Sequence, residues 1–246
     1  MPYRRLPTTD KARLRALETA LNTANDRDSG KLAFSKATLI ELKEVKFNFE
    51  THLIHHNLDV KIESEKATDY KLTYEKARMY ISHFIQVLYM TIERGELNQD
   101  ALVYYDLNDM DRKIPGLGSE QEILQWGNKI IQGEQKRMQR GGSPIYNPSI
   151  ALVKVNVENF NEAAIFQANL RKNTLRSFEK IQRIRKDTNE FISRLWNEIE
   201  TNSENLPSSH MRQRSEEYGV VYVYRRQEKK KIKIEGMQID LLFEFN

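Results

Sequence analysis

Three histidines, His52, His55 and His56, form a close group of side chains that could bind a metal ion. Residues four apart lie on one face of a helix, so His52 and His56 could hold an ion between them. The sequence specifies no third ligand, and it lacks the Glu-x-x-His pairs with which helical bundles bind two metal ions. We therefore interpret these histidines as structural or solvent-exposed side chains, and we expect no metal site.

A glycine pair, Gly116-Leu117-Gly118, precedes a predicted helix and suggests a phosphate-binding loop. No strand is predicted before it, and the complete dinucleotide-binding and P-loop patterns are absent. A plain loop before Ser119, the expected N-cap, is the better interpretation.

Signatures of common enzyme classes are missing as well. The sequence contains no Gly-x-Ser-x-Gly, no His-Glu-x-x-His, and no kinase or deaminase pattern. It contains no Cys, which excludes disulfides, thiolate metal ligands and cysteine nucleophiles. We expect no catalytic residue and no cofactor, although an acid–base pair assembled from distant side chains stays an open alternative.

One basic run could recognise a partner. Residues 225–233 carry +5 within a net charge of +4, so the rest of the chain carries −1. Such a run could neutralise phosphates, with Tyr222 and Tyr224 stacking on bases. A solvent-exposed hairpin turn explains the run more simply. The residues of the nucleic-acid alternative are Arg225, Arg226, Lys229, Lys230, Lys231 and Lys233.

Composition favours helices over a β-rich fold. The 246 residues are 39% hydrophobic and 30% charged, with only 6 Pro and 10 Gly. Residues 1–7 lack the apolar run of a signal peptide, and the apolar-rich residues 84–92 are too few to span a bilayer. We expect a soluble, cytoplasmic protein without membrane contact.

Two long runs without Gly or Pro must form the main helices. The first, residues 31–94, follows a short helix that Thr8, Thr9 or Asp10 caps and Gly30 ends. Its apolar residues recur at steps of three, four or seven, as in a heptad seam. A single helix of this size would be about 90 Å long. We therefore predict a helical hairpin that bends within 57–66. The second run covers 149–206, after a helix that starts at Ser119.

The two halves of the chain resemble each other. Leu14, Leu17 and Leu21 match Ile123, Trp126 and Ile130 at an offset of 109, and residues 84–93 match 191–200 at 107. Between them, residues 39–48 match 152–161 at 113, which pairs Phe47 with Phe160. We predict repeat 1 at 1–97, a linker at 98–118, repeat 2 at 119–207 and a tail at 208–246. Residues 220–224 and 232–245 are β-prone, which predicts a hairpin in this tail.

Four segments resemble an uncharacterised family of two-repeat helical bacterial proteins. They are residues 1–17 (MPYRRLPTTDKARLRAL), 80–97 (YISHFIQVLYMTIERGEL), 141–151 (GGSPIYNPSIA) and 216–223 (EEYGVVYV). The resemblance implies an all-helical fold and no assigned activity, so no functional residue is carried over.

The predicted fold is all-α, an elongated helical bundle of two tandem repeats with a short C-terminal β-hairpin. The lack of catalytic motifs and the long amphipathic helices favour a non-enzymatic interaction or scaffold protein that binds a protein partner or itself. The alternative is a nucleic-acid-associated accessory protein that acts through the basic run. No small-molecule ligand is predicted.

Overall fold

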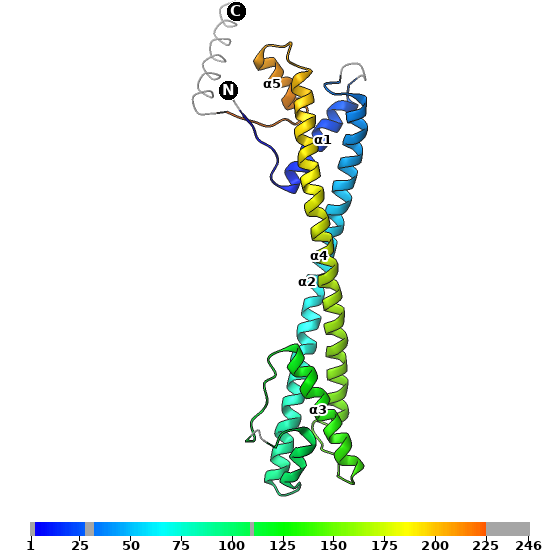
Figure 1. Ribbon diagram of the computed structural model, residues 1–246, viewed down its shortest axis with the longest axis vertical. Coiled ribbons are helices and arrows are strands. Elements are labelled where there is room, and N and C mark those ends of the chain that lie inside the picture. Colours follow the sequence, from blue (N-terminus) through cyan, green and yellow to red (C-terminus); the bar gives the residue numbers. More distant parts are fainter. Residues whose placement is uncertain (1–2, 28–31, 109–110, 225–246) are drawn as a thin grey trace, which may run out of the picture. The chain divides into compact units, whose positions relative to one another are not determined.

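The computed structural model describes residues 3–27, 32–108 and 111–224, and these are mostly helical (Figure 1). The all-α prediction is therefore confirmed. The elements are β1 (Tyr3–Arg4), α1 (Asp10–Asn25), α2 (Lys36–Glu93), the 3₁₀ helix η1 (Gln99–Tyr105), α3 (Glu120–Gln139), α4 (Ile150–Thr201), α5 (Ser208–Glu217) and β2 (Tyr222–Val223).

The predicted bend within 57–66 is wrong, because α2 continues through it as one helix of 58 residues. No Gly or Pro interrupts these residues, and each half of α2 has its own packing partners. In its first half, Leu42 and Phe49 lie in two separate buried clusters, and in its second half, buried residues between Ala77 and Tyr89 lie in a third. Helix α4 is likewise unbroken over 52 residues.

The chain forms two compact units, and both long helices contribute to each of them. Unit 1 comprises residues 1–57 and 176–246, and unit 2 comprises residues 58–175. Unit 1 buries Leu17 of α1, Leu42 of α2 and Trp196 of α4 in one core. Tyr218 closes that core, and its hydroxyl accepts a hydrogen bond of 3.2 Å from the Ala33 backbone N–H.

Unit 2 has its own core of residues from α2, η1, α3 and α4. Ile81, Phe84 and Phe160 are completely buried in it. Gly133 of α3 allows close contact with η1, because a Cβ at this position would lie 2.5 Å from the Tyr104 carbonyl oxygen. Part of the predicted linker is thus a packed 3₁₀ helix rather than an irregular segment.

The predicted strand at 220–224 forms β2, and its described partner is the N-terminal strand β1. The pairing is antiparallel, with Tyr3 opposite Val223 and Arg4 opposite Tyr222. Extending the pairing, the Arg5 backbone N–H donates to the Val221 carbonyl over 2.8 Å. The second strand predicted for the tail, at 232–245, lies outside the described residues.

The order of buried and exposed residues is similar in the two halves of the chain for two of the three predicted repeat matches. Residues 11–20 and 121–130 show the same order of buried, half-buried and exposed positions, at an offset of 110 rather than 109. Residues 84–93 and 191–200 share buried aromatic and leucine positions at 107. The middle match pairs exposed Phe47 with buried Phe160, whereas an offset of 111 pairs Phe160 with buried Phe49. The internal repeat itself stays a prediction.

Candidate functional site

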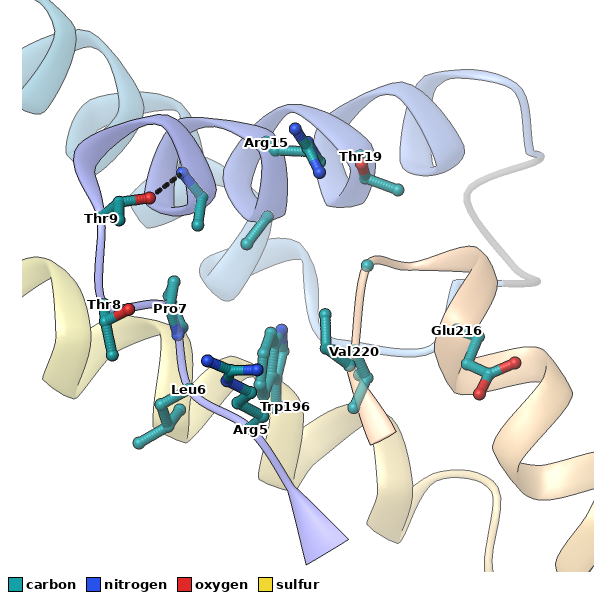
Figure 2. A pocket seen from close by; sticks show the side chains of 14 residues that line it. Arg5, Leu6, Pro7, Thr8, Thr9, Arg15, Thr19, Trp196, Glu216 and Val220 are labelled. Carbon is teal, nitrogen blue, oxygen red and sulfur yellow. Dashed lines mark hydrogen bonds between the residues drawn. The ribbon is translucent and has the colours of Figure 1, made fainter. Parts of the chain in front are cut away.

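A pocket of about 550 Å³ lies in unit 1 between α1, α4, the N-terminal segment and the residues after α5 (Figure 2). Pairing of β1 with β2 holds the N-terminal segment beside Val220 and Val221. The chain then turns into α1 at Thr9, whose hydroxyl accepts a hydrogen bond of 3.2 Å from the Ala12 backbone N–H. Residues 5–9 and 219–221, which are more than 200 positions apart in the sequence, therefore line one site.

Ion pairs fix α1 beside the pocket. Both carboxylate oxygens of Asp10 accept hydrogen bonds from Arg185 of α4, at 2.9 and 2.7 Å, and Arg13 adds a third bond of 3.0 Å. Arg13 also donates to the Asn189 side chain over 2.8 Å. The hydrogen bonds from Arg185 lower the pKa of Asp10 below its usual value, although partial burial acts against them.

We expect Asp10→Asn to destabilise the protein by about 1–2 kcal/mol at neutral pH, because it removes the charge that pairs with Arg185. A lowered pKa means that this stabilisation is present above the unfolded value and disappears as the pH falls through the folded one. The difference from wild type should therefore shrink below pH 3.8, the ordinary pKa of an Asp. Urea unfolding at pH 7 and in acid measures both effects. Asp69→Asn, which breaks only an exposed pair with Lys66, is the control, and an equal loss there would contradict the assignment.

The floor of the pocket contains an unpaired hydrogen-bond donor. The indole of Trp196 is completely buried, and its Nε1 has no hydrogen-bond partner among the described residues. Figure 2 shows Trp196 between Arg5 and Val220, with the indole nitrogen on the ring edge that faces α1. An unsatisfied buried N–H costs free energy comparable to a lost hydrogen bond, and such groups are rare in folded proteins.

Two unpaired cations flank the same pocket. The guanidinium groups of Arg5 and Arg15 make no hydrogen bond or ion pair with any described residue, and both side chains are exposed. The neighbouring Arg4, by contrast, lies 3.4 Å from the Glu200 carboxylate. The lining contains one acidic residue, Glu216, whose carboxylate accepts a hydrogen bond from the Tyr224 hydroxyl at 3.4 Å. The side chains around the opening therefore have an excess of positive charge.

The remaining lining of the pocket is largely apolar. Leu6, Pro7, Ala16 and Val220 form apolar walls, and the lining contains no His, Ser or Cys that could serve as a base or an activated nucleophile.

A separate surface candidate lies on α2 in unit 1. Ile40, Phe47 and Ile54 are 62%, 72% and 61% exposed. Their spacing of seven places them along one helix face, whereas the buried Leu42 and Phe49 lie on the opposite face, toward the core. We call these three residues the α2 stripe.

The predicted histidine group does not form a ligand set. His52 Nδ1 lies 2.8 Å from the Asn48 carbonyl oxygen, and His56 Nδ1 lies 3.1 Å from the Ser177 hydroxyl. Within the described part of the chain, no three His, Asp or Glu residues come together in a way that could hold a metal ion.

The glycine pair before α3 is a loop whose anion position is already taken. The carboxylate of Glu122 accepts hydrogen bonds from the backbone N–H groups of Gly118 and Ser119, at 2.9 and 2.8 Å. Ser119 in turn accepts from the Glu122 backbone N–H, which completes a capping box. A bound phosphate would have to displace this internal carboxylate.

The six cations of the nucleic-acid alternative, from Arg225 to Lys233, lie outside the described residues. Of the tyrosines assigned to stacking, Tyr222 donates a hydrogen bond of 2.5 Å from its hydroxyl to Glu200. Burial and this contact raise the pKa of Tyr222. The Tyr222 side chain is half-buried within unit 1.

Comparisons with protein-family models, with curated proteins and with solved structures found no match to this chain. The resemblance to a two-repeat bacterial family thus stays a prediction. No helix in the described ranges combines the length and apolar character that crossing a bilayer requires.

Sequence reasoning placed Trp196 among the core aromatics and did not single out Arg5 or Arg15. The amphipathic pattern of 191–200 predicts burial of the Trp196 ring, which is correct. Whether its N–H finds an acceptor depends on contacts with α1 and Val220, and no local pattern contains that information.

Proposed function

We propose that this protein is a non-enzymatic interaction protein that associates with a second copy of itself through the α2 stripe. The observation that carries the proposal is the exposure of Ile40, Phe47 and Ile54, which are each more than 60% accessible at heptad spacing. Helices that present apolar residues every seven positions associate by packing these side chains against a partner helix. Large exposed apolar groups that lie together mark interaction sites.

The order of the side chains supports a second copy as the partner. The sequence Ile40, Phe47, Ile54 is the same in both directions, with Phe47 at its centre. An antiparallel pair with its two-fold axis at Phe47 places Ile40 against Ile54 of the partner subunit, and an isologous interface requires such self-complementarity.

Charges beside the stripe fit the same arrangement. Lys43 and Glu50 flank Phe47 on one side of the helix, three residues before and three residues after it. The two-fold axis therefore brings Lys43 close to Glu50 of the partner subunit, and symmetry creates a second, identical pair. Lys43 makes no ion pair with a described residue, and Glu50 keeps 40% of its side chain exposed beside Lys46.

Sedimentation equilibrium over a range of protein concentrations tests this proposal. Wild-type protein is expected to form dimers, and Phe47→Glu should abolish them because it brings two carboxylates together at the axis. Val103→Glu, a change at another apolar residue with 63% exposure, should leave dimers intact. Lys43→Glu should weaken the dimer, and Lys43→Glu combined with Glu50→Lys should restore it. A wild-type protein that stays monomeric, or a Phe47→Glu variant that still dimerises, would refute the proposal.

A further inference from the structure

The pocket beneath α1 has a polar floor with an unmet hydrogen-bond requirement. Trp196 Nε1–H is the donor, and it has no partner among the described residues. Three lining residues, Thr8, Thr9 and Thr19, have a hydroxyl that could accept from it, but none of them is hydrogen-bonded to it, and Thr9 already accepts from Ala12. Because this nitrogen has almost no accessible surface, a ligand atom reaches it only when the lining opens slightly around the ring, and it then restores the hydrogen bond that folding leaves unmade.

The charge around the pocket selects an anion. Arg5 and Arg15 approach the opening from two separate segments, and neither is neutralised by a described acidic residue. Thr9, at the N-terminus of α1, also lines the site, and the positive end of a helix dipole favours negative charge. The lining contains two arginines and one acidic residue, Glu216. One negative charge on the ligand would therefore neutralise the remaining positive charge.

The walls and the size of the pocket define the rest of the ligand. Leu6, Pro7, Ala16 and Val220 provide apolar contacts on several sides. A volume of about 550 Å³ lies within the range of small-molecule sites and suits a chain or ring system of roughly ten carbon atoms. Two small residues of α1, Ala12 and Ala16, leave this space open.

We propose that this pocket binds an amphipathic monocarboxylate, with the apolar part between α1 and Val220 and the carboxylate near Arg5 and Arg15. On binding, the lining opens slightly around Trp196, and a ligand oxygen accepts the hydrogen bond of its Nε1. This site is distinct from the α2 stripe, and its occupancy does not require the proposed dimer.

Isothermal titration calorimetry with octanoate tests the assignment on the full chain. Octanoate is expected to bind, whereas octan-1-ol and octylamine should bind at least about tenfold more weakly, since they have the same chain without the anion. Replacing both Arg5 and Arg15 by glutamine should weaken octanoate binding about tenfold, since each exposed ion pair contributes only a severalfold gain in affinity. Arg183→Gln, an exposed arginine of α4 outside the pocket, should change nothing.

Two further variants separate the pocket from general charge effects. Ala12→Leu keeps a good helix former and fills the space, so it should abolish octanoate binding while circular dichroism stays unchanged. Trp196→Phe keeps the ring and removes the N–H, so it should weaken the acid severalfold. If Trp196→Phe fails to fold, the Ala12→Leu and arginine variants still test whether octanoate binds in this pocket. Undetectable octanoate binding, equal affinity for octan-1-ol, or unchanged binding in Ala12→Leu would each overturn the proposal.

Discussion

Replacing Glu134 by alanine is expected to lower the free energy of unfolding by about 3–5 kcal/mol, because the change leaves the buried Arg137 guanidinium without its counter-charge. Glu134 is completely buried, and Arg137 is 4% exposed. The carboxylate accepts hydrogen bonds from Arg137 Nε and Nη2, at 2.9 and 2.8 Å, and from the Ile145 backbone N–H at 3.0 Å. The Tyr105 hydroxyl also donates to it.

The pH dependence of this pair has a defined sign. Burial by itself raises the pKa of Glu134, but the hydrogen bonds from Arg137, Tyr105 and Ile145 outweigh it and lower the value. The stabilisation is therefore present above the unfolded pKa and is lost as the pH falls through the folded one. The wild type should lose part of its advantage over Glu134→Ala below pH 4.5, the ordinary value for a Glu.

Urea unfolding of Glu134→Ala at pH 7 and in acid measures this effect. Glu158→Ala is the matched control, because Glu158 forms an exposed pair with Lys154 on α4 at 3.7 Å. Such surface pairs contribute at most about 1 kcal/mol. A loss at Glu134 no greater than that at Glu158 would show that the buried pair contributes no more to stability than an exposed one.

The second large effect is expected at two buried phenylalanines. Phe49→Ala in unit 1 and Phe160→Ala in unit 2 should each destabilise the protein by about 3–5 kcal/mol, since both side chains are fully buried. Phe47→Ala, two residues from Phe49 and 72% exposed, should change the stability of dilute monomeric protein by no more than about 0.5 kcal/mol.

Thermal and urea unfolding at low protein concentration give the comparison. The result also distinguishes two alignments of the proposed repeats. If Phe47→Ala were as damaging as Phe160→Ala, the two residues would have equivalent roles in stability, as the offset of 113 requires. The expected result supports an offset of 111 in this segment.

The helices were predictable because two physical signals agreed. Runs without Gly or Pro set their approximate ends, and the spacing of apolar residues showed which face is buried, as at Leu17, Trp126 and Trp196. The bend in α2 was predicted from the usual size of domains and not from any residue, and the structure contradicts it there. A helix of 58 residues is stable because separate sets of side chains pack against each of its halves.

The candidate sites were harder to predict. The pocket depends on contacts between residues 5–9, α1, Trp196 and residues 219–221, which no local pattern encodes. The α2 stripe was missed, because the predicted heptad seam did not include Ile40, Phe47 or Ile54, although these residues also recur every seven positions. Phe49 is buried and Phe47 is 72% exposed, so two phenylalanines only two positions apart point in opposite directions.

The division of the chain into a continuous and a discontinuous unit has a consequence for biosynthesis. Unit 2 is a single stretch, residues 58–175, so all of its packing partners have left the ribosome before the chain is finished. Unit 1 joins residues 1–57 to residues from 176 onward, and Leu17 cannot contact Trp196 or Tyr218 until α4 and α5 have been translated. During synthesis the packing partners of unit 2 are therefore complete before those of α1.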